Sequence, residues 1–223
     1  MEESSFDKLR ALLRKEPVVK EVAKKVTVQE DKFSEIESLL SKESRVLSEI
    51  NKQIMSFGFL QILFSNDSSD TKEVLIALVK KCFVEKKTPV LVLFSTNYKS
   101  MLDLLNESKI NSEQIIIIDT VSKNISRVKE SRNLLFVDSL RNLTQLEIKS
   151  VNIIGAVKDP CFIFDSMSVL DLFHKEDVIL KFFYSFTKLL HRKSVPGVYL
   201  ISKKKALPKV MQFFDDFVEM EKI

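Results

Sequence analysis

The most constraining feature of this sequence is a series of short apolar runs that alternate with amphipathic segments from residue 57 onward. The run of four isoleucines at 115–118 is the clearest example, because it has no polar residue on either face. Strands of this kind are typical of parallel sheets that are buried on both faces. Their alternation with helices indicates βαβ units, and therefore an α/β fold with a doubly wound, mostly parallel sheet. Ligands of such sheets bind at the carboxyl ends of the strands.

The individual elements follow from the same patterns. Strands are predicted over 59–64, 90–94, 114–118, 134–137, 161–164 and 197–201. Helices are predicted at about 70–86, 98–108, 122–131, 142–157 and 175–193, and a last amphipathic helix near 206–220.

The first 56 residues have a different pattern and are predicted to form a helical extension, with the α/β domain covering 57–223. Apolar side chains recur there at steps of three and four, at Val19, Val22, Val26, Phe33, Ile36, Leu40, Leu47, Ile50 and Ile54. This a/d heptad pattern indicates a coiled-coil-like segment that pairs two chains or docks on a partner. A helical hairpin that folds back on the protein's own core would show the same pattern, so both interpretations stay open.

Composition narrows the class of protein. Apolar residues make up 45% and charged residues 30% of the chain, which is typical of a globular protein and excludes a disordered one. The net charge of +4 is too modest to favour nucleic-acid binding. Cys82 and Cys161 lack CxxC spacing and nearby histidines, so neither a disulfide framework nor a metal site is expected. No apolar run approaches the length of a membrane span, and the charged first ten residues lack a signal core, so we expect a cytoplasmic protein.

Four segments in a fixed order carry a resemblance to a known family. They are IIIIDTVS at 115–122, LFVDSLRNLTQLEI at 135–148, CFIFDSMSVLDLF at 161–173 and FTKLLHRKSVPGVYLIS at 186–202. Together with the order of strands and helices, they resemble the archaeal RecA/KaiC-like P-loop ATPase superfamily. The resemblance implies a RecA-like sheet in which Asp165 ends the Walker B strand and Ser166 follows it.

The phosphate-binding loop of that family is altered in this chain. The family pattern G-x-x-x-x-G-K-[ST] cradles phosphate with backbone N–H groups, and its hydroxyl holds Mg²⁺. Aligned on Lys72, the two glycines become Asn66 and Thr71, and the hydroxyl position becomes Glu73. A β-branched threonine resists the backbone angles that glycine adopts freely. Asp70 and Glu73 add carboxylates, and two like charges 4 Å apart repel by roughly 4 kcal/mol at a dielectric constant of about 20.

A second alteration affects the catalytic base. The family carries a glutamate just after the second strand, whereas this chain has Ser95-Thr96-Asn97 there, and asparagine cannot act as a general base. We therefore predict no catalytic residue, no metal site and no cofactor, with neither ATP nor Mg²⁺ expected to bind. Asp165 is expected to cap the helix that follows it. The predicted degenerate nucleotide site consists of Asn66, Asp70, Thr71, Lys72, Glu73, Asp165 and Ser166.

These observations favour a non-catalytic RecA/KaiC-like protein, which works as a regulatory or scaffolding subunit. It would act through self-association or a protein partner, with the N-terminal helices as one contact. One alternative is a nucleotide-binding switch or slow ATPase with a non-standard phosphate loop, for which Lys72 and Asp165 are the only sequence support. A further alternative is an accessory protein of DNA recombination or repair, against which the modest charge argues.

Overall fold

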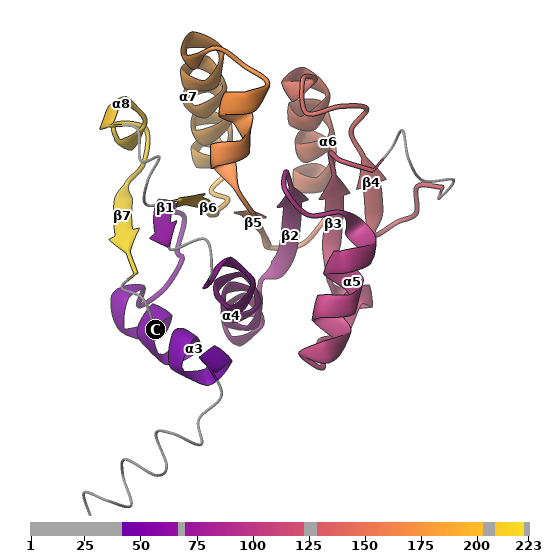
Figure 1. The fold of residues 1–223 in the computed structure, drawn as a ribbon, viewed down its shortest axis with the longest axis vertical. Helices are drawn as coiled ribbons and strands as arrows, with labels where there is room; N and C mark the ends of the chain where they lie inside the picture. The colour runs from indigo at the N-terminus through magenta and orange to yellow at the C-terminus, as the bar shows by residue number, and fades with distance from the viewer. Residues whose placement is uncertain (1–41, 67–69, 123–128, 203–207, 221–223) are drawn as a thin grey trace, which may run out of the picture. The chain divides into compact units, whose positions relative to one another are not determined.

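Seven parallel strands form the centre of the structure, a computed structural model that describes residues 42–66, 70–122, 129–202 and 208–220 (Figure 1). The sheet order is β4-β3-β2-β5-β6-β1-β7. The strands are β1 (Gln61–Asn66), β2 (Thr88–Leu93), β3 (Ile116–Asp119), β4 (Leu134–Phe136), β5 (Pro160–Phe164), β6 (Gly197–Ser202) and β7 (Asp216–Glu219). All pairings between these strands are parallel, so the predicted α/β sheet is confirmed.

Helices cover both faces of this sheet (Figure 1). One layer consists of α3 (Lys42–Gln53), α4 (Thr71–Val84) and α5 (Tyr98–Glu107). The other consists of α6 (Leu143–Ala156), α7 (Glu176–Arg192) and the short α8 (Pro208–Met211), with the 3-10 helix η3 (Met167–Leu172). A second 3-10 helix, η2 (Ser112–Gln114), precedes β3.

The strand side chains alternate between the two hydrophobic cores, as the period of a strand requires. In β1, Ile62 and Phe64 pack with α3 and α4, while Leu63 between them packs with the α7 layer. Both sets are buried, which explains why the strands read as continuous apolar runs. Phe182, Phe183 and Phe186 of α7 are likewise buried in this second core.

Helix α3 packs directly on α4. Its residues Val46 and Ile50 are buried in the same core as β1, and Glu43 forms an ion pair with Lys80 of α4. For residues 42–54, the fold-back interpretation therefore describes the structure. Helix α3 belongs to the same compact unit as the sheet, since that unit begins at Lys42. The rest of the predicted extension, with most of its heptads, lies outside the described residues.

The predicted helix at 206–220 is wrong in most of its length. Among the described residues of this segment, Pro208–Met211 alone is helical, and Asp216–Glu219 instead forms strand β7 along the free edge of β1. The backbone N–H of Asp215 donates to the carbonyl of Gln61 at 2.9 Å, which starts this pairing. Val218 and Met220 are buried while Glu219 is exposed, so the segment also carries the alternation of a strand. The segment therefore fits both a helical and a strand pattern, and pairing with the open edge of β1 selects the strand.

The helix predicted at 122–131 falls largely on residues 123–128, which lie outside the described part of the chain. Residues 129–131 are not helical, and Ser131 forms an antiparallel bridge with Leu134 at the start of β4. Within the described ranges, no helix combines the length and apolar character needed to cross a membrane.

Candidate functional site at the carboxyl edge of the sheet

The carboxyl ends of β1, β2 and β5 place the predicted site residues along one edge of the sheet. β2 and β5 are neighbours, and β6 alone separates β5 from β1. The segment after β1 leads into α4, the segment after β2 leads into α5, and Asp165 follows β5 directly.

Asp165 is almost completely buried, at 1% exposure, and both of its carboxylate oxygens accept hydrogen bonds from the turn after β2. Oδ1 accepts from the N–H of Phe94 at 2.7 Å and from that of Ser95 at 3.3 Å. Oδ2 accepts from the Ser95 N–H at 3.1 Å, the Ser95 hydroxyl at 2.9 Å and the Thr96 N–H at 3.0 Å. The carboxylate therefore holds a turn 70 residues earlier in the chain.

This geometry corrects the prediction that Asp165 caps the helix that follows it. The following 3-10 helix η3 has Ser166 at its N-cap position, and that side chain makes no capping hydrogen bond. Because the partner turn is distant in sequence, nothing in the local pattern around Asp165 distinguishes the two roles.

Burial raises the pKa of Asp165, and the hydrogen bonds from Phe94, Ser95 and Thr96 oppose this rise without cancelling it. A folded pKa above the unfolded value of about 3.9 means that the folded state binds the proton more tightly. This tighter binding adds to the free energy of unfolding. The addition is complete at a pH below the pKa of Asp165 in the unfolded state, and it is lost as the pH rises through the pKa in the folded state.

The end of β1 and the start of α4 are also held by contacts within the protein. The Asn66 side chain donates to the hydroxyl of Thr71 at 3.0 Å, which links the two positions aligned with the family's glycines. Asp70 precedes α4 and is 1% exposed, yet its side chain makes no capping bond to the helix. Lys42 of α3 reaches Asp70 at 2.6 Å and Glu73 at 4.0 Å.

Lys42 contacts the candidate site, and sequence reasoning missed it. Its hydrogen bond to Asp70 is the main cause that raises the pKa of the Lys42 ammonium, so this lysine stays charged beside the two carboxylates. Lys42 lies 28 residues before Asp70, and its position on the heptad segment gives no signal of the contact. Helix α3 thus supplies a cation that pairs with Asp70 and lies within 4.0 Å of Glu73.

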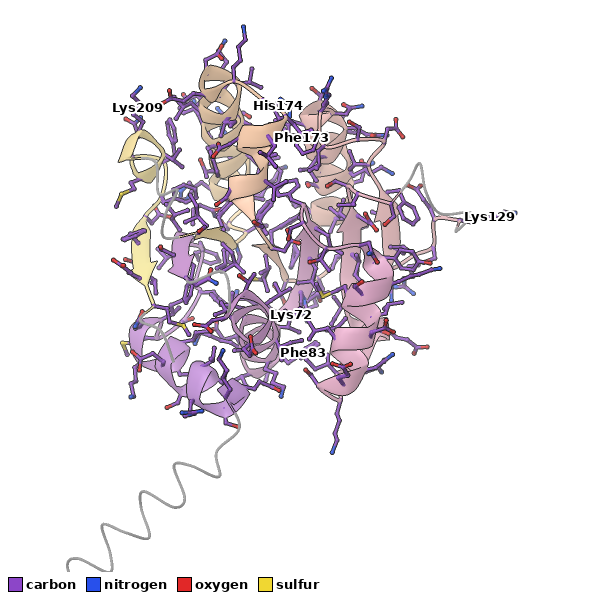
Figure 2. The ribbon with its side chains drawn as sticks, viewed as in Figure 1. Lys72, Phe83, Lys129, Phe173, His174 and Lys209 are labelled. Carbon is purple, nitrogen blue, oxygen red and sulfur yellow. The ribbon has the colours of Figure 1, made fainter. Side chains whose placement is uncertain are left out.

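Lys72 lies on the other side of α4 from the carboxylates that Lys42 contacts. It is exposed on the first turn of α4, on the side that faces α5 (Figure 2). A cleft of about 240 Å³ lies there between the two helices. Its walls include Lys72 and Leu75 of α4, Met101, Asp103 and Glu107 of α5, and Asp165. Lys72 and Asp165 thus line the same cleft, whereas Asp70 and Glu73 point to Lys42.

A second carboxylate at the end of a strand, that of Asp119, also accepts hydrogen bonds from backbone N–H groups. Its oxygens accept from the backbone N–H groups of Tyr98 at 2.9 Å, Val121 at 2.7 Å and Ser122 at 2.8 Å. Asp119 therefore stabilises the turn that follows it and the start of α5. In the part of the chain that the structure describes, no group of three or more His, Cys, Asp or Glu side chains could hold a metal ion.

Comparison with known proteins supports the fold. No family model matches this chain, and no curated protein matches it. Among solved structures, a KaiC-like protein from the hyperthermophilic archaeon Pyrococcus horikoshii is similar, with a TM-score of 0.56 and 12% sequence identity. The match covers 74% of this chain and 75% of that chain. The predicted RecA-like fold is confirmed by this likeness.

Proposed function

We propose that this protein is a RecA-like protein without ATPase activity, which acts as a regulatory or scaffolding subunit through self-association or a protein partner. The main support is the state of Asp165, the residue aligned with the Walker B acid. Both of its oxygens are engaged by the turn after β2, and the side chain is buried. A cation would have to replace several of these hydrogen bonds to bind there.

The phosphate side of the site gives independent support. A triphosphate placed beside α4 would meet the carboxylates of Asp70 and Glu73, against which Lys42 supplies one positive charge. Displacing Lys42 would leave the buried Asp70 carboxylate without this cation, which is costly. The cleft beside Lys72 measures about 240 Å³, below the roughly 300 Å³ at which pockets for drug-sized ligands begin.

Exposed apolar side chains support the interaction role. Met55 is 93% exposed, Phe59 62% and Val84 79%. Lys81 of α4 donates to the carbonyl of Met55, and the backbone N–H of Phe57 donates to Glu85, so the 55–59 loop lies beside the end of α4. Clustered apolar residues on a surface often mark sites of protein association. We call Met55, Phe59 and Val84 the apolar patch.

Light scattering on the purified protein tests this proposal. We expect a mass of at least two chains at high protein concentration, with no change when Mg-ATP is added. The double substitution Phe59→Asp and Val84→Asp should shift the protein toward one chain, because a charged side chain would have to be desolvated in the interface. Ile148→Asp, an exposed position on α6, is the matched control and should leave the mass unchanged.

Two outcomes would count against this proposal. A mass of one chain at every concentration would exclude self-association, and assembly that depends on Mg-ATP would favour the nucleotide-binding switch. That switch rests on Lys72 and Asp165, and a DNA-repair accessory rests on the family resemblance. No contact in the described residues specifically favours either one.

A further inference from the structure

A second set of exposed apolar side chains lies on the turn between η3 and α7. Leu172 is 73% exposed, Phe173 40% and Val178 38%. Leu172 is the last residue of η3, and Phe173 follows it beside His174 (Figure 2). Val178 lies in the first turn of α7, where its backbone N–H donates to the carbonyl of Lys175 at 3.0 Å. We call Leu172, Phe173 and Val178 the η3–α7 patch.

The η3–α7 patch and the apolar patch lie at opposite ends of the strands. In the apolar patch, Phe59 comes just before β1, and Val84 ends the helix that leads to the start of β2. The η3–α7 patch instead follows the end of β5. Because all strands are parallel, their amino ends share one edge of the sheet and their carboxyl ends share the other. The two patches also belong to different helical layers, so one chain cannot bring them into contact.

Positive charge lies beside the apolar patch. The carboxylate of Glu85 pairs with Lys81 at 3.3 Å, and Lys86 and Lys87 follow it in the chain. Lys87 donates to the carbonyl of Gly58 at 3.3 Å, which places it beside Phe59. Within the described ranges, no ion pair joins Lys86 or Lys87 to a carboxylate. These two lysines therefore give this patch a positive rim.

Negative charge lies within the segment 171–178, which carries the η3–α7 patch. Asp171, Glu176 and Asp177 outnumber Lys175 there, and all four residues are exposed. Glu176 also pairs with Lys209 of α8 at 3.0 Å. The aspartates therefore give this patch a rim of the opposite sign.

We propose that the apolar patch of one copy docks on the η3–α7 patch of a second copy, head to tail. Both apolar surfaces would then leave water, with Lys86 and Lys87 near Asp171 and Asp177. Pairing of two apolar patches would instead bring lysines against lysines. A head-to-tail pair keeps one unused patch at each end, so copies continue to add unless the rotation between them closes a ring. This inference rests on the proposed function, because it specifies how self-association occurs.

Light scattering on two variants, measured alone and mixed, tests the proposal. Wild-type protein should exceed the mass of two chains at high concentration. Phe59→Asp with Val84→Asp disables the apolar patch, and Leu172→Asp with Val178→Asp disables the η3–α7 patch. Each variant alone should need at least about tenfold more protein to assemble, because a charge must be desolvated in the interface. An equimolar mixture should form a complex of two chains and grow no further, because each variant supplies the patch that the other lacks.

Val151→Asp, at a 45% exposed position on α6, is the matched control and should assemble like the wild type. Leu172→Asp alone, at the most exposed position of its patch, repeats the test if circular dichroism shows that the double variant is unfolded.

Two results would overturn this inference while the wild type still assembles and the proposed function stands. One is a mixture that stays at the mass of one chain. The other is assembly of Leu172→Asp with Val178→Asp at the concentration that the wild type needs, which would mean that the apolar patch pairs with itself. A wild type of one chain at every concentration would remove self-association and this inference together.

Discussion

Replacing Asp165 with asparagine is expected to lower the free energy of unfolding by about 3 kcal/mol. The amide has one acceptor oxygen, whereas the carboxylate accepts from three backbone N–H groups and one hydroxyl. The amide nitrogen would face the N–H of Ser95 or Thr96, and each buried donor that loses its partner costs about 1–3 kcal/mol. Removal of a buried charge offsets part of this cost, since burial raises the pKa of Asp165.

Urea unfolding at neutral pH measures this effect as a lower midpoint with an unchanged slope. Asp103→Asn is the matched control, because Asp103 is exposed on α5, and a change within about 0.5 kcal/mol is expected there. A loss below about 1 kcal/mol in Asp165→Asn would mean that the turn does not depend on the carboxylate. Asp165 would then be free to bind a cation, which contradicts the proposed function.

Gly197→Ala should destabilise the protein by about 2 kcal/mol, because the new methyl group has no space. A Cβ at this position would lie 2.5 Å from Gln61 Oε1 and 2.8 Å from a ring carbon of Tyr199. Neither side chain moves freely. The Gln61 amide donates to the Val195 carbonyl at 2.8 Å and accepts from the Tyr199 hydroxyl at 2.9 Å, and the Tyr199 ring stacks on Phe164 with centroids 4.5 Å apart.

Thermal unfolding of Gly197→Ala and Gly155→Ala measures this difference. A Cβ at Gly155 meets nothing within 4 Å, and Gly155 lies inside α6, where alanine favours the helix by about 0.5–1 kcal/mol. The two variants should therefore shift the melting temperature in opposite directions. A neutral Gly197→Ala would show that the Gln61–Tyr199 contact relaxes at little cost, and that β6 needs no glycine beside β1.

Hydrophobic periodicity was sufficient to predict most of the α/β body. Strands buried on both faces, such as Val90 to Phe94, leave a signal that needs no knowledge of their partners. The C-terminal segment shows the limit of this reasoning. Val210, Phe213, Phe214 and Phe217 have helical spacing, but the open edge of β1 recruits Asp216–Glu219 as a strand, and tertiary pairing overrides local preference.

For the candidate site, the sequence predicted which residues belong to it but not which of them contact each other. The residues aligned with the phosphate loop could be recognised in order, and Asn66 and Thr71 do lie in contact. The contacts that matter most join distant parts of the chain: Lys42 with Asp70, and Asp165 with the turn at 94–96. A sequence pattern records spacing along the chain, so it carries no information on which cation balances which carboxylate.

A calorimetric titration of the full chain with Mg-ATP tests the central claim most directly. With Asp165 held by the 94–96 turn and Asp70 paired with Lys42, we expect no saturable heat of binding. One-to-one binding that is abolished by Asp165→Asn in a folded variant and by Lys72→Met would contradict this account. It would show that the carboxyl edge of the sheet still holds a nucleotide.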